Sequence, residues 1–290
     1  MPTPTCLSVL SMLQPCIETL RYSDGYRAAV RWWRPPEPRG AVLYFHGIQS
    51  HGGWYEMSGA RLAEAGFTVL MPDRRGSGLN QAQRGHSPSI ERSVQDAEES
   101  LSEVLRISGK PAAHLVGVSW GGKLCVSLAA KLPEQVATMS LIAPGLFPRV
   151  DVSATEKIRI ALSIVNDRER AYDIPLNDAQ MFTNNPERIR YVEGDRLKLV
   201  QVTAGFLLIS RRLDRSTARL AESTYRNPIH LLLAGHDKII HNDRTSDWLR
   251  GLPSPDRQIT MYPEGHHTLE FDADPTAFIE DLCAWIAKRA

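Results

Sequence analysis

The chain has few cysteines and no pairing pattern among them. Only four cysteines occur in 290 residues, at Cys6, Cys16, Cys125 and Cys283, and none forms a Cys-x-x-Cys pair. Such spacing is typical neither of a disulfide framework nor of a zinc site. We therefore expect reduced thiols in a cytoplasmic enzyme.

An excess of charge of one sign is also absent. The formal net charge is +1, from 34 basic and 33 acidic residues. No overall field favours nucleic acid or an anionic membrane surface. We expect a small-molecule substrate and no nucleic-acid partner, while the composition sets no oligomeric state.

Long hydrophobic runs are missing as well. No stretch reaches the roughly 18 to 20 apolar residues that a membrane-spanning helix needs, so we expect no integral membrane association. The apolar run Leu7 to Leu13 lacks the basic n-region and the cleavage site of a signal peptide. It is interpreted as a mobile or docked N-terminus.

The nine histidines form no metal-binding pattern. Neither His-x-x-x-His nor His-Glu-x-x-His occurs. The adjacent His266 and His267 cannot readily share a metal as neighbouring loop residues. We expect neither a metal nor a cofactor.

What the chain does contain is an alternation of short β-rich runs with helical patterns. With 42% hydrophobic residues, the chain can bury a large core. The alternation predicts an α/β fold with a mainly parallel central sheet and helices on both faces. The expected strands are Tyr26 to Trp33, Ala41 to Phe45, Thr68 to Met71, His114 to Val118, Met139 to Ile142, Ile229 to Leu233 and Gln258 to Tyr262.

The alternation stops after Pro144 and resumes near Arg226. We expect an inserted helical lid over residues 146–225, between a first core part at 1–145 and a second at 226–290. Its helices are predicted at Ile158 to Val165 and Leu197 to Leu213. The apolar stretch Val202 to Ile209 is compatible with a membrane-surface helix, but a buried lid helix is the favoured interpretation.

The strongest chemical signal is Gly117-Val118-Ser119-Trp120-Gly121, which follows a strand and precedes a helix of small residues. This is the setting of a nucleophile elbow, where flanking glycines relieve a tight turn and leave the serine Oγ exposed. The helix N-terminus adds free N–H groups beside the reaction centre. We expect Ser119 to be the nucleophile.

A serine nucleophile needs a histidine base and a carboxylate that orients it. Asp237 comes just past the strand ending at Leu233, where side chains project into the ligand crevice of open α/β sheets. His266 and His267 follow the next strand, which completes the order serine, acid, histidine. Asp243 and Asp256 fit solvated positions better.

An oxyanion hole requires preorganised N–H donors. The backbone N–H of Trp120, directly after the nucleophile, is one candidate. The other is the N–H of Ile48, because His46-Gly47-Ile48 begins where a predicted strand ends. His51-Gly52-Gly53 lies too far past the strand to serve.

Taken together, these motifs resemble the monoacylglycerol lipase and lysophospholipase branch of the α/β-hydrolases. The resemblance runs from about Val42 to the C-terminus and rests on several further spacings. They are His46-Gly47 with His51 and Tyr55, Leu62 to Phe67, Asp73-x-x-Gly76-x-Gly78, Arg84-Gly85-His86 with Asp96, Pro228, Gly235-x-Asp237 and Glu264-Gly265.

The resemblance implies an α/β-hydrolase fold and a triad of Ser119, Asp237 and His267. His267 is preferred over His266 because it stands where the family's histidine follows a glycine and precedes a leucine by two positions. The resemblance also assigns the oxyanion hole to Ile48 and Trp120. Departures fall near specificity: Ile48-Gln49, Trp120, Asn80 and a poorly matching lid. Gln49 and His51 are therefore candidate substrate-binding residues.

We further expect a hydrophobic acyl pocket under the lid, with Phe206 as a substrate-binding residue. Its other candidate lining residues, Leu199, Val202 and Leu207, share one face of the predicted lid helix with it. Ordinary packing of lid against core is the alternative for each of them. Each methylene buried in such a pocket contributes about 0.8 kcal/mol.

The function predicted from these residues is hydrolysis of carboxylic esters, of a lipid-like substrate, through an acyl-Ser119 intermediate. Thioesterase, lactonase, amidase and carbon–carbon hydrolase chemistries use the same triad and remain open. A dehalogenase or epoxide hydrolase would need aspartate at position 119. A non-catalytic binding protein on this fold would be expected to have lost a triad member.

Overall fold

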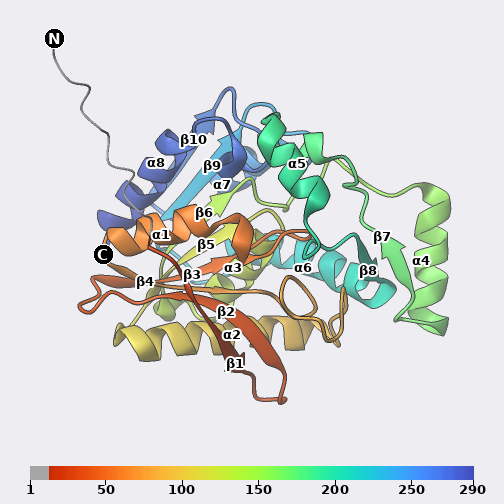
Figure 1. Ribbon diagram of the computed structural model, residues 1–290, viewed down its shortest axis with the longest axis horizontal. Helices are drawn as coiled ribbons and strands as arrows, with labels where there is room; N and C mark the ends of the chain where they lie inside the picture. Colours follow the sequence, from red (N-terminus) through yellow and green to blue (C-terminus); the bar gives the residue numbers. More distant parts are fainter. Residues whose placement is uncertain (1–12) are drawn as a thin grey trace, which may run out of the picture.

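A computed structural model describes residues 13–290, except for the side chains of residues 216–219, 221 and 222. Its centre is an eight-stranded sheet with the strand order β1-β2-β4-β3-β5-β6-β9-β10 (Figure 1). The strands are β1 (Cys16–Arg21), β2 (Arg27–Trp33), β3 (Gly40–Phe45), β4 (Phe67–Pro72), β5 (Ala113–Val118), β6 (Val136–Ile142), β9 (Ile229–Ala234) and β10 (Arg257–Tyr262).

Burial on both faces explains the composition of the central strands. Every residue of β3, β4, β5 and β9 is buried, as expected of parallel strands with helices on both sides. Strands β4, β3, β5, β6, β9 and β10 run parallel to one another. Strand β2 is antiparallel to both β1 and β4. The prediction of a mainly parallel sheet is confirmed, and β1 is an edge strand that the sequence pattern did not reveal.

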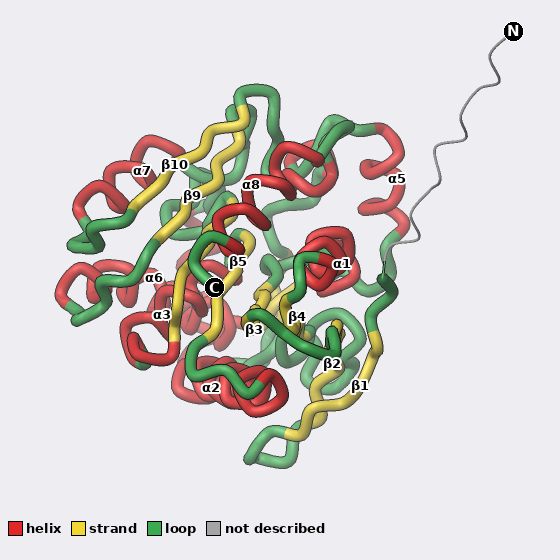
Figure 2. The backbone as a smooth tube through the Cα atoms, turned by 90° about the vertical axis from the view of Figure 1, so that its left-hand side faces the viewer, coloured by secondary structure: helices red, strands yellow, loops and turns green. Residues whose placement is uncertain are grey.

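Helices cover both faces of the sheet (Figure 2). On one face lie α1 (Glu56–Glu64) and α8 (Thr276–Ala287), and on the other lie α2 (Ile90–Ser108), α3 (Gly121–Lys131) and α7 (Asn242–Gly251). Helix α2 begins at a Ser89 cap and ends at Gly109, which adopts a positive φ of 67°.

The segment predicted as a lid projects to one side of the sheet (Figure 1). It contains α4 (Ala154–Asn166), α5 (Pro186–Gly194) and α6 (Ala204–Glu222). It also contains a two-stranded sheet of β7 (Ala171–Asp173) and β8 (Gln201–Thr203). The division of the chain at residues 146 and 226 stays a prediction.

The predicted helix from Leu197 to Leu213 is wrong in its first part. Residues 201–203 pair with β7, and α6 begins only at Ala204 because the Thr203 side chain accepts a hydrogen bond from the N–H of Phe206. The β-branched residues Val200, Val202 and Thr203 favour an extended backbone at this point.

Two expectations concern the membrane and the N-terminus. Within residues 13–290, no helix is long and apolar enough to cross a membrane. Residues 7–12 of the apolar N-terminal run lie outside the described residues.

Candidate active site

Ser119 occupies the sharp turn between β5 and α3. Its φ is +50°, in the left-handed region that residues other than glycine rarely adopt. The two flanking glycines make the turn possible: a Cβ on Gly117 would lie 2.8 Å from the Cα of Gly122, and one on Gly121 would collide with the carbonyl oxygen of Phe45. The structure therefore has the strained strand-to-helix turn of a nucleophile elbow.

His267 and Asp237 form a buried pair. The distance between His267 Nδ1 and Asp237 Oδ2 is 2.8 Å, and the other carboxylate oxygen accepts hydrogen bonds from the N–H groups of Ile239 and Ile240. Burial raises the pKa of Asp237, but the charge and hydrogen bond of His267 and the two backbone donors outweigh it, so the pKa lies below its ordinary value. Asp237 is thus held as a carboxylate against the imidazole.

The adjacent His266 has a different partner. Its Nδ1 lies 3.2 Å from Asp272 Oδ1, and its ring contacts that of His236. Of the two histidines, only His267 contacts Asp237. The alternative acid, Asp243, lies exposed in the first turn of α7.

The free nitrogen of His267 is the atom that would accept a proton from Ser119. His267 Nε2 is buried and has no hydrogen-bond partner, and its ring packs edge-on against Phe182 at a centroid distance of 6.1 Å. The structure brings Asp237 and His267 together; the hydrogen bond from Ser119 Oγ to Nε2 stays a prediction.

The loop after β3 passes beside the nucleophile. A Cβ on Gly47 would lie 3.4 Å from the Cβ of Ser119. The Gly47 carbonyl accepts hydrogen bonds from His46 Nδ1 at 2.8 Å and from Arg74 Nη2 at 2.7 Å. In a planar trans peptide the N–H of Ile48 points the opposite way from that carbonyl. The two donors therefore hold the Ile48 N–H in a set direction.

Arg74 contacts both residues predicted for the oxyanion hole. Its Nη2 also donates to the carbonyl of Ile48 at 2.9 Å, and its guanidinium stacks on the Trp120 ring at 4.5 Å. Burial lowers the pKa of Arg74 to about 9, although Asp73 opposes the change. Sequence reasoning missed this residue; the available signal was a charged side chain directly after a fully buried strand.

A cavity of about 310 Å³ opens beside the nucleophile. Ser119, Ile48 and Trp120 line it together. Most of the remaining wall is apolar and comes from the lid segment and the loop after β9, including Ile164, Ile174, Leu176, Leu207, Ile239 and Ile240. The polar part of the wall is formed by Lys123, Ser210, Arg211 and Asp214, together with the ion pair of Lys157 and Asp151.

Three predicted substrate-binding residues lie elsewhere. Gln49 is buried, and its carbonyl accepts a hydrogen bond from the N–H of Leu199. The His51 ring lies 3.1 Å from Asp195 Oδ2 and so connects the loop after β3 to the segment predicted as a lid. Neither residue lines the cavity of Ser119, so their role in substrate binding stays a prediction.

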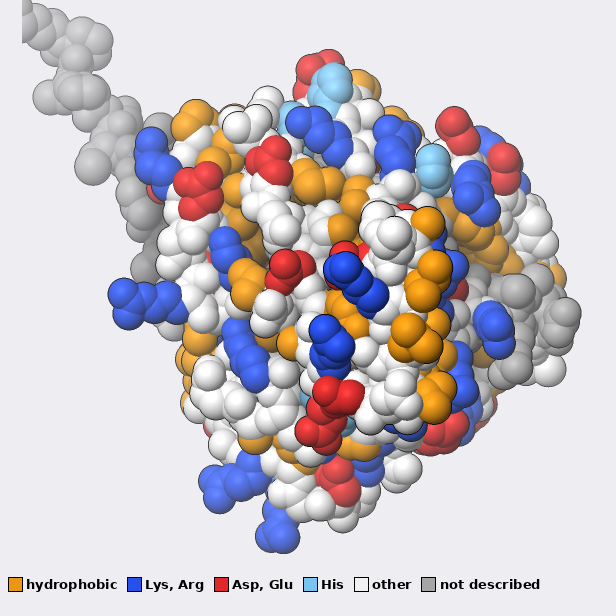
Figure 3. All heavy atoms as spheres, turned by 90° about the vertical axis from the view of Figure 1, so that its right-hand side faces the viewer, with side chains coloured by type: hydrophobic (Ala, Val, Ile, Leu, Met, Phe, Trp, Pro, Cys, Tyr) orange, Lys and Arg blue, Asp and Glu red, His pale blue; other side chains and the backbone are white. Residues whose placement is uncertain are grey.

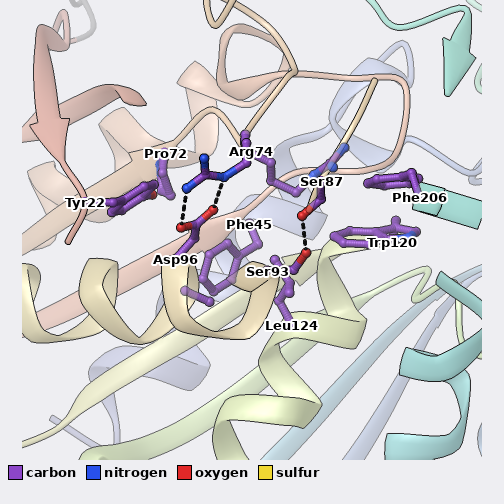
Figure 4. A pocket seen from close by; sticks show the side chains of 12 residues that line it. Tyr22, Phe45, Pro72, Arg74, Ser87, Ser93, Asp96, Trp120, Leu124 and Phe206 are labelled. Atoms are coloured by element: carbon purple, nitrogen blue, oxygen red, sulfur yellow. Dashed lines mark hydrogen bonds and ion pairs between the residues drawn. The ribbon is translucent and has the colours of Figure 1, made fainter. Parts of the chain in front are cut away.

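Phe206 also lies outside the lining of the large cavity, and its role in substrate binding stays a prediction. It stacks on Trp120 at a centroid distance of 5.2 Å and lines a separate cavity of about 30 Å³ (Figure 4). That space has the size of a single water molecule, too small for an acyl chain. Leu199 and Val202 are buried outside α6, and of the four acyl-pocket candidates only Leu207 lines the large cavity.

The outer surface of the lid segment mixes charges with apolar side chains (Figure 3). On α4, Ile158, Leu162 and Val165 are 62%, 60% and 83% exposed, and their spacing puts them on one face. Basic and acidic side chains alternate around the hydrophobic ones on this side of the molecule. Among the described residues, no three His, Cys, Asp or Glu side chains gather as a metal site would require.

Comparison with known proteins places the chain in a family. The family model of serine aminopeptidase S33, a hydrolase family, matches residues 36–274. The chain belongs to this family. The predicted resemblance to monoacylglycerol lipases, the hydrolase class and the α/β-hydrolase fold are thereby confirmed.

Individual relatives of this hydrolase are distant in sequence. It is 22% identical to the monoglyceride lipase of Mus musculus over 92% of this chain and 89% of the relative. It is 23% identical to the monoacylglycerol lipase of Mycolicibacterium smegmatis over 91% and 94% of the two chains. It spans only 29% of an uncharacterized abhydrolase domain-containing protein of Dictyostelium discoideum, with 23% identity over 94% of this chain.

The fold of the hydrolase agrees with solved structures. A soluble variant of the monoglyceride lipase from Saccharomyces cerevisiae, in complex with a substrate analogue, superimposes with a TM-score of 0.85. The match covers 99% of both chains at 18% identity. Sequence has therefore diverged far more than architecture in this family.

Proposed function

We propose that this hydrolase cleaves carboxylic esters with an apolar acyl group, such as monoacylglycerols and related lipid-like esters, through an acyl-Ser119 intermediate. The observation that carries the proposal is Ser119 on a strained elbow in the wall of a cavity of about 310 Å³ that is largely apolar. The names of the mouse and mycobacterial relatives support the same substrate class.

The first step joins Ser119 to the acyl group. Ser119 Oγ attacks the ester carbonyl while His267 Nε2 takes the hydroxyl proton, and Asp237 stabilises the resulting imidazolium through its 2.8 Å contact with Nδ1. The carbonyl oxygen becomes an oxyanion that accepts hydrogen bonds from the N–H groups of Ile48 and Trp120. When the tetrahedral species collapses, His267 returns the proton to the leaving alcohol.

The second step releases the acid. Water enters the place of the alcohol, His267 removes one of its protons, and the hydroxide oxygen attacks the acyl carbonyl. A second oxyanion forms in the same hole. Its collapse returns the proton to Ser119 Oγ and frees the carboxylic acid.

The inserted segment has a physical role in this proposal. Residues of α4 and α6 roof the cavity, and excluding water strengthens the contacts to the oxyanion. Each acyl methylene that enters contributes about 0.8 kcal/mol. We therefore propose that residues 146–225 act as a lid. We also propose a cytoplasmic location, because the three described cysteines are free thiols.

A panel of substrates tests the function. We expect kcat/KM to rise from p-nitrophenyl acetate towards medium-chain esters, together with release of fatty acid from monoacylglycerols. Matched thioester, lactone and p-nitroanilide substrates test the other serine chemistries, the anilide because the family is described as aminopeptidases. The Ser119→Ala variant should lose turnover and labelling by a fluorophosphonate. Labelling of that variant at the wild-type level would refute the nucleophile, and a rate that falls steadily from acetate would refute the apolar acyl pocket.

A further inference from the structure

One wall of the Ser119 cavity is polar, although the rest of it is largely apolar. Lys123 lies in the first turn of α3, one turn beyond the nucleophile, and is only 4% exposed. Its Nζ lies 2.5 Å from Asp214 Oδ1 and 3.1 Å from Ser210 Oγ on α6. Ser210 and Asp214 are four residues apart and so share one face of that helix.

Two hydrogen-bond donors of this wall are left without an acceptor. Ser210 Oγ accepts from Trp120 Nε1 at 3.0 Å as well as from Lys123, which uses both of its lone pairs. Its own hydrogen is donated to no described residue. The ammonium of Lys123 has three N–H groups, of which Asp214 and Ser210 take two. The wall therefore offers two hydrogens to an acceptor in the cavity.

The charges on the wall favour an anionic acceptor. Lys123, Lys157 and Arg211 supply three positive charges in the cavity wall against the two carboxylates of Asp151 and Asp214. Lys157 pairs with Asp151, and Arg211 Nη1 lies 3.9 Å from Asp214 Oδ2. Burial lowers the pKa of Lys123, while Asp214 favours its charged form. A buried ion pair seldom adds stability over apolar packing of the same volume. A lysine in this place is better explained by what enters the cavity.

We propose that Lys123 and Ser210 bind an anionic group, a carboxylate or a phosphate, carried by the ester substrate. The proposal rests on the proposed esterase function and narrows its substrate class from neutral lipid-like esters to esters with an anionic group. Arg211 adds a long-range attraction, and Asp214 holds Lys123 in position while it limits the net positive charge.

Matched pairs of esters test the inference. The first pair is p-nitrophenyl hexanoate and the mono-p-nitrophenyl ester of adipic acid, which differ by a terminal carboxylate. The second pair is a monoacylglycerol and the same acylglycerol carrying a phosphate. The two pairs distinguish carboxylate from phosphate as the anion. The measured quantity is the ratio of kcat/KM for the anionic ester to kcat/KM for the neutral one.

Two variants should change this ratio in opposite directions, and a third serves as the control. Lys123→Met should lower it by about ten-fold or more, the value of a hydrogen bond to a charged group. Asp214→Asn should raise it, because a competing negative charge is lost. Lys131→Met, on the same helix but with a side chain 58% exposed, should leave it unchanged. A purely structural ion pair would predict equal losses for both members and no change in the ratio.

Direct binding separates this inference from the proposed function. In the Ser119→Ala background, isothermal titration should show tighter binding of the anionic ester than of the neutral one, and Lys123→Met should remove the difference. This result stands even if the wild-type enzyme prefers another bond to an ester. An unchanged ratio together with unchanged binding in Lys123→Met would overturn the inference.

Discussion

Two residues at the candidate active site adopt energetically unfavourable states. Ser119 keeps a left-handed backbone, and Arg74 keeps a charge in a buried position. Each costs free energy that the surrounding structure must supply, on the order of 1 to 3 kcal/mol for the backbone alone. Such costs at neighbouring positions fit a site selected for chemistry.

The two histidines differ in their partners, and this difference predicts their roles. His267→Ala should lose almost all activity, because the base and its contact with Asp237 disappear together. His266→Ala should keep substantial activity, since its partner is Asp272. Steady-state kinetics on a medium-chain ester measures both. A dead His266→Ala and a live His267→Ala would reverse the assignment.

Arg74 should act as a positioning residue for the oxyanion hole. Arg74→Met releases the carbonyls of Gly47 and Ile48, so the Ile48 N–H loses its fixed direction. We expect kcat to fall by about ten- to a hundred-fold, less than the 10² to 10³ for loss of an oxyanion donor, with KM little changed because Arg74 does not line the large cavity.

A partly buried arginine provides the control for this experiment. Arg84 also donates hydrogen bonds to backbone carbonyls, but these belong to Gly78, Leu197 and Lys198 and not to Gly47 or Ile48. Arg84→Met should lower the melting temperature while leaving kcat close to the wild-type value. Added guanidinium should restore part of the activity of Arg74→Met and should not change the activity of Arg84→Met. A matching loss of kcat in both variants would indicate a structural role for Arg74.

At the scale of elements, α4 and α6 make different contacts with the core. Helix α6 packs on α3 through the stack of Phe206 on Trp120 and through the ion pair of Asp214 with Lys123. Helix α4 turns Ile160 and Ile164 towards the cavity and leaves Leu162 exposed. Helix α6 therefore supports the nucleophile elbow, and α4 sets part of the cavity's apolar wall.

This arrangement predicts how α4 controls acyl-chain length. Ile164→Trp should fill part of the cavity, lowering kcat/KM for medium-chain esters while leaving acetate hydrolysis near the wild-type level. Leu162→Trp, on the exposed face of the same helix, should leave the whole profile unchanged. The measurement is kcat/KM across p-nitrophenyl esters of increasing length. Equal profiles for both variants would place the acyl group outside this cavity.

At the scale of the whole molecule, a buried carboxyl group connects the segment after His267 to helix α1. Glu270 follows His267 by three residues, and its carboxylate accepts hydrogen bonds from the N–H and hydroxyl of Ser58 on α1. Burial raises the pKa of Glu270 from 4.5 to about 7, against the opposing effect of the Ser58 hydrogen bonds. The folded protein therefore retains this proton at pH values where the unfolded chain has released it.

Glu270 should make stability depend on pH. Between pH 4.5 and about 7 the folded state binds more protons than the unfolded state, so the free energy of unfolding falls as pH rises. The contribution is fully present below pH 4.5 and lost by about pH 7, on the order of 3 kcal/mol.

Denaturant unfolding at a series of pH values measures this contribution. Glu270→Gln should flatten the slope over that interval, because the amide does not titrate. Glu64→Gln, which removes an exposed carboxylate on α1, should leave the slope as in the wild type. A Glu270→Gln protein with the wild-type slope would contradict the assignment.

Local patterns were sufficient for the sheet and for the order of the site residues. Strands buried on both faces read as apolar runs, and the elbow needs glycines at fixed offsets from the serine, so both leave marks within a few residues. The seven predicted strands overlap the observed β2, β3, β4, β5, β6, β9 and β10. Edge strand β1 escaped because five of its six residues are exposed and it therefore has no clear apolar pattern.

Residues 146–225, the proposed lid, show where local patterns stop being sufficient. A helical face was predicted through Leu199, Val202, Phe206 and Leu207, but the pairing of β8 with β7 ends that helix at Ala204. Which apolar side chains meet the cavity then depends on how α6 packs on α3, a contact between segments some ninety residues apart, such as Trp120 with Ser210. Phe206 therefore stacks on Trp120 and lies outside the lining of the Ser119 cavity.

The sequence by itself determined the reaction class, because nucleophile, acid and base follow strands in an order that only one arrangement of the sheet brings together. Tertiary structure alone decided two further matters: that Arg74 donates hydrogen bonds to the carbonyls of Gly47 and Ile48, and that Lys123 lines the cavity of Ser119. Each depends on side-chain directions across long sequence separations. Local periodicity carries no record of those directions, since they are set by the packing of whole elements.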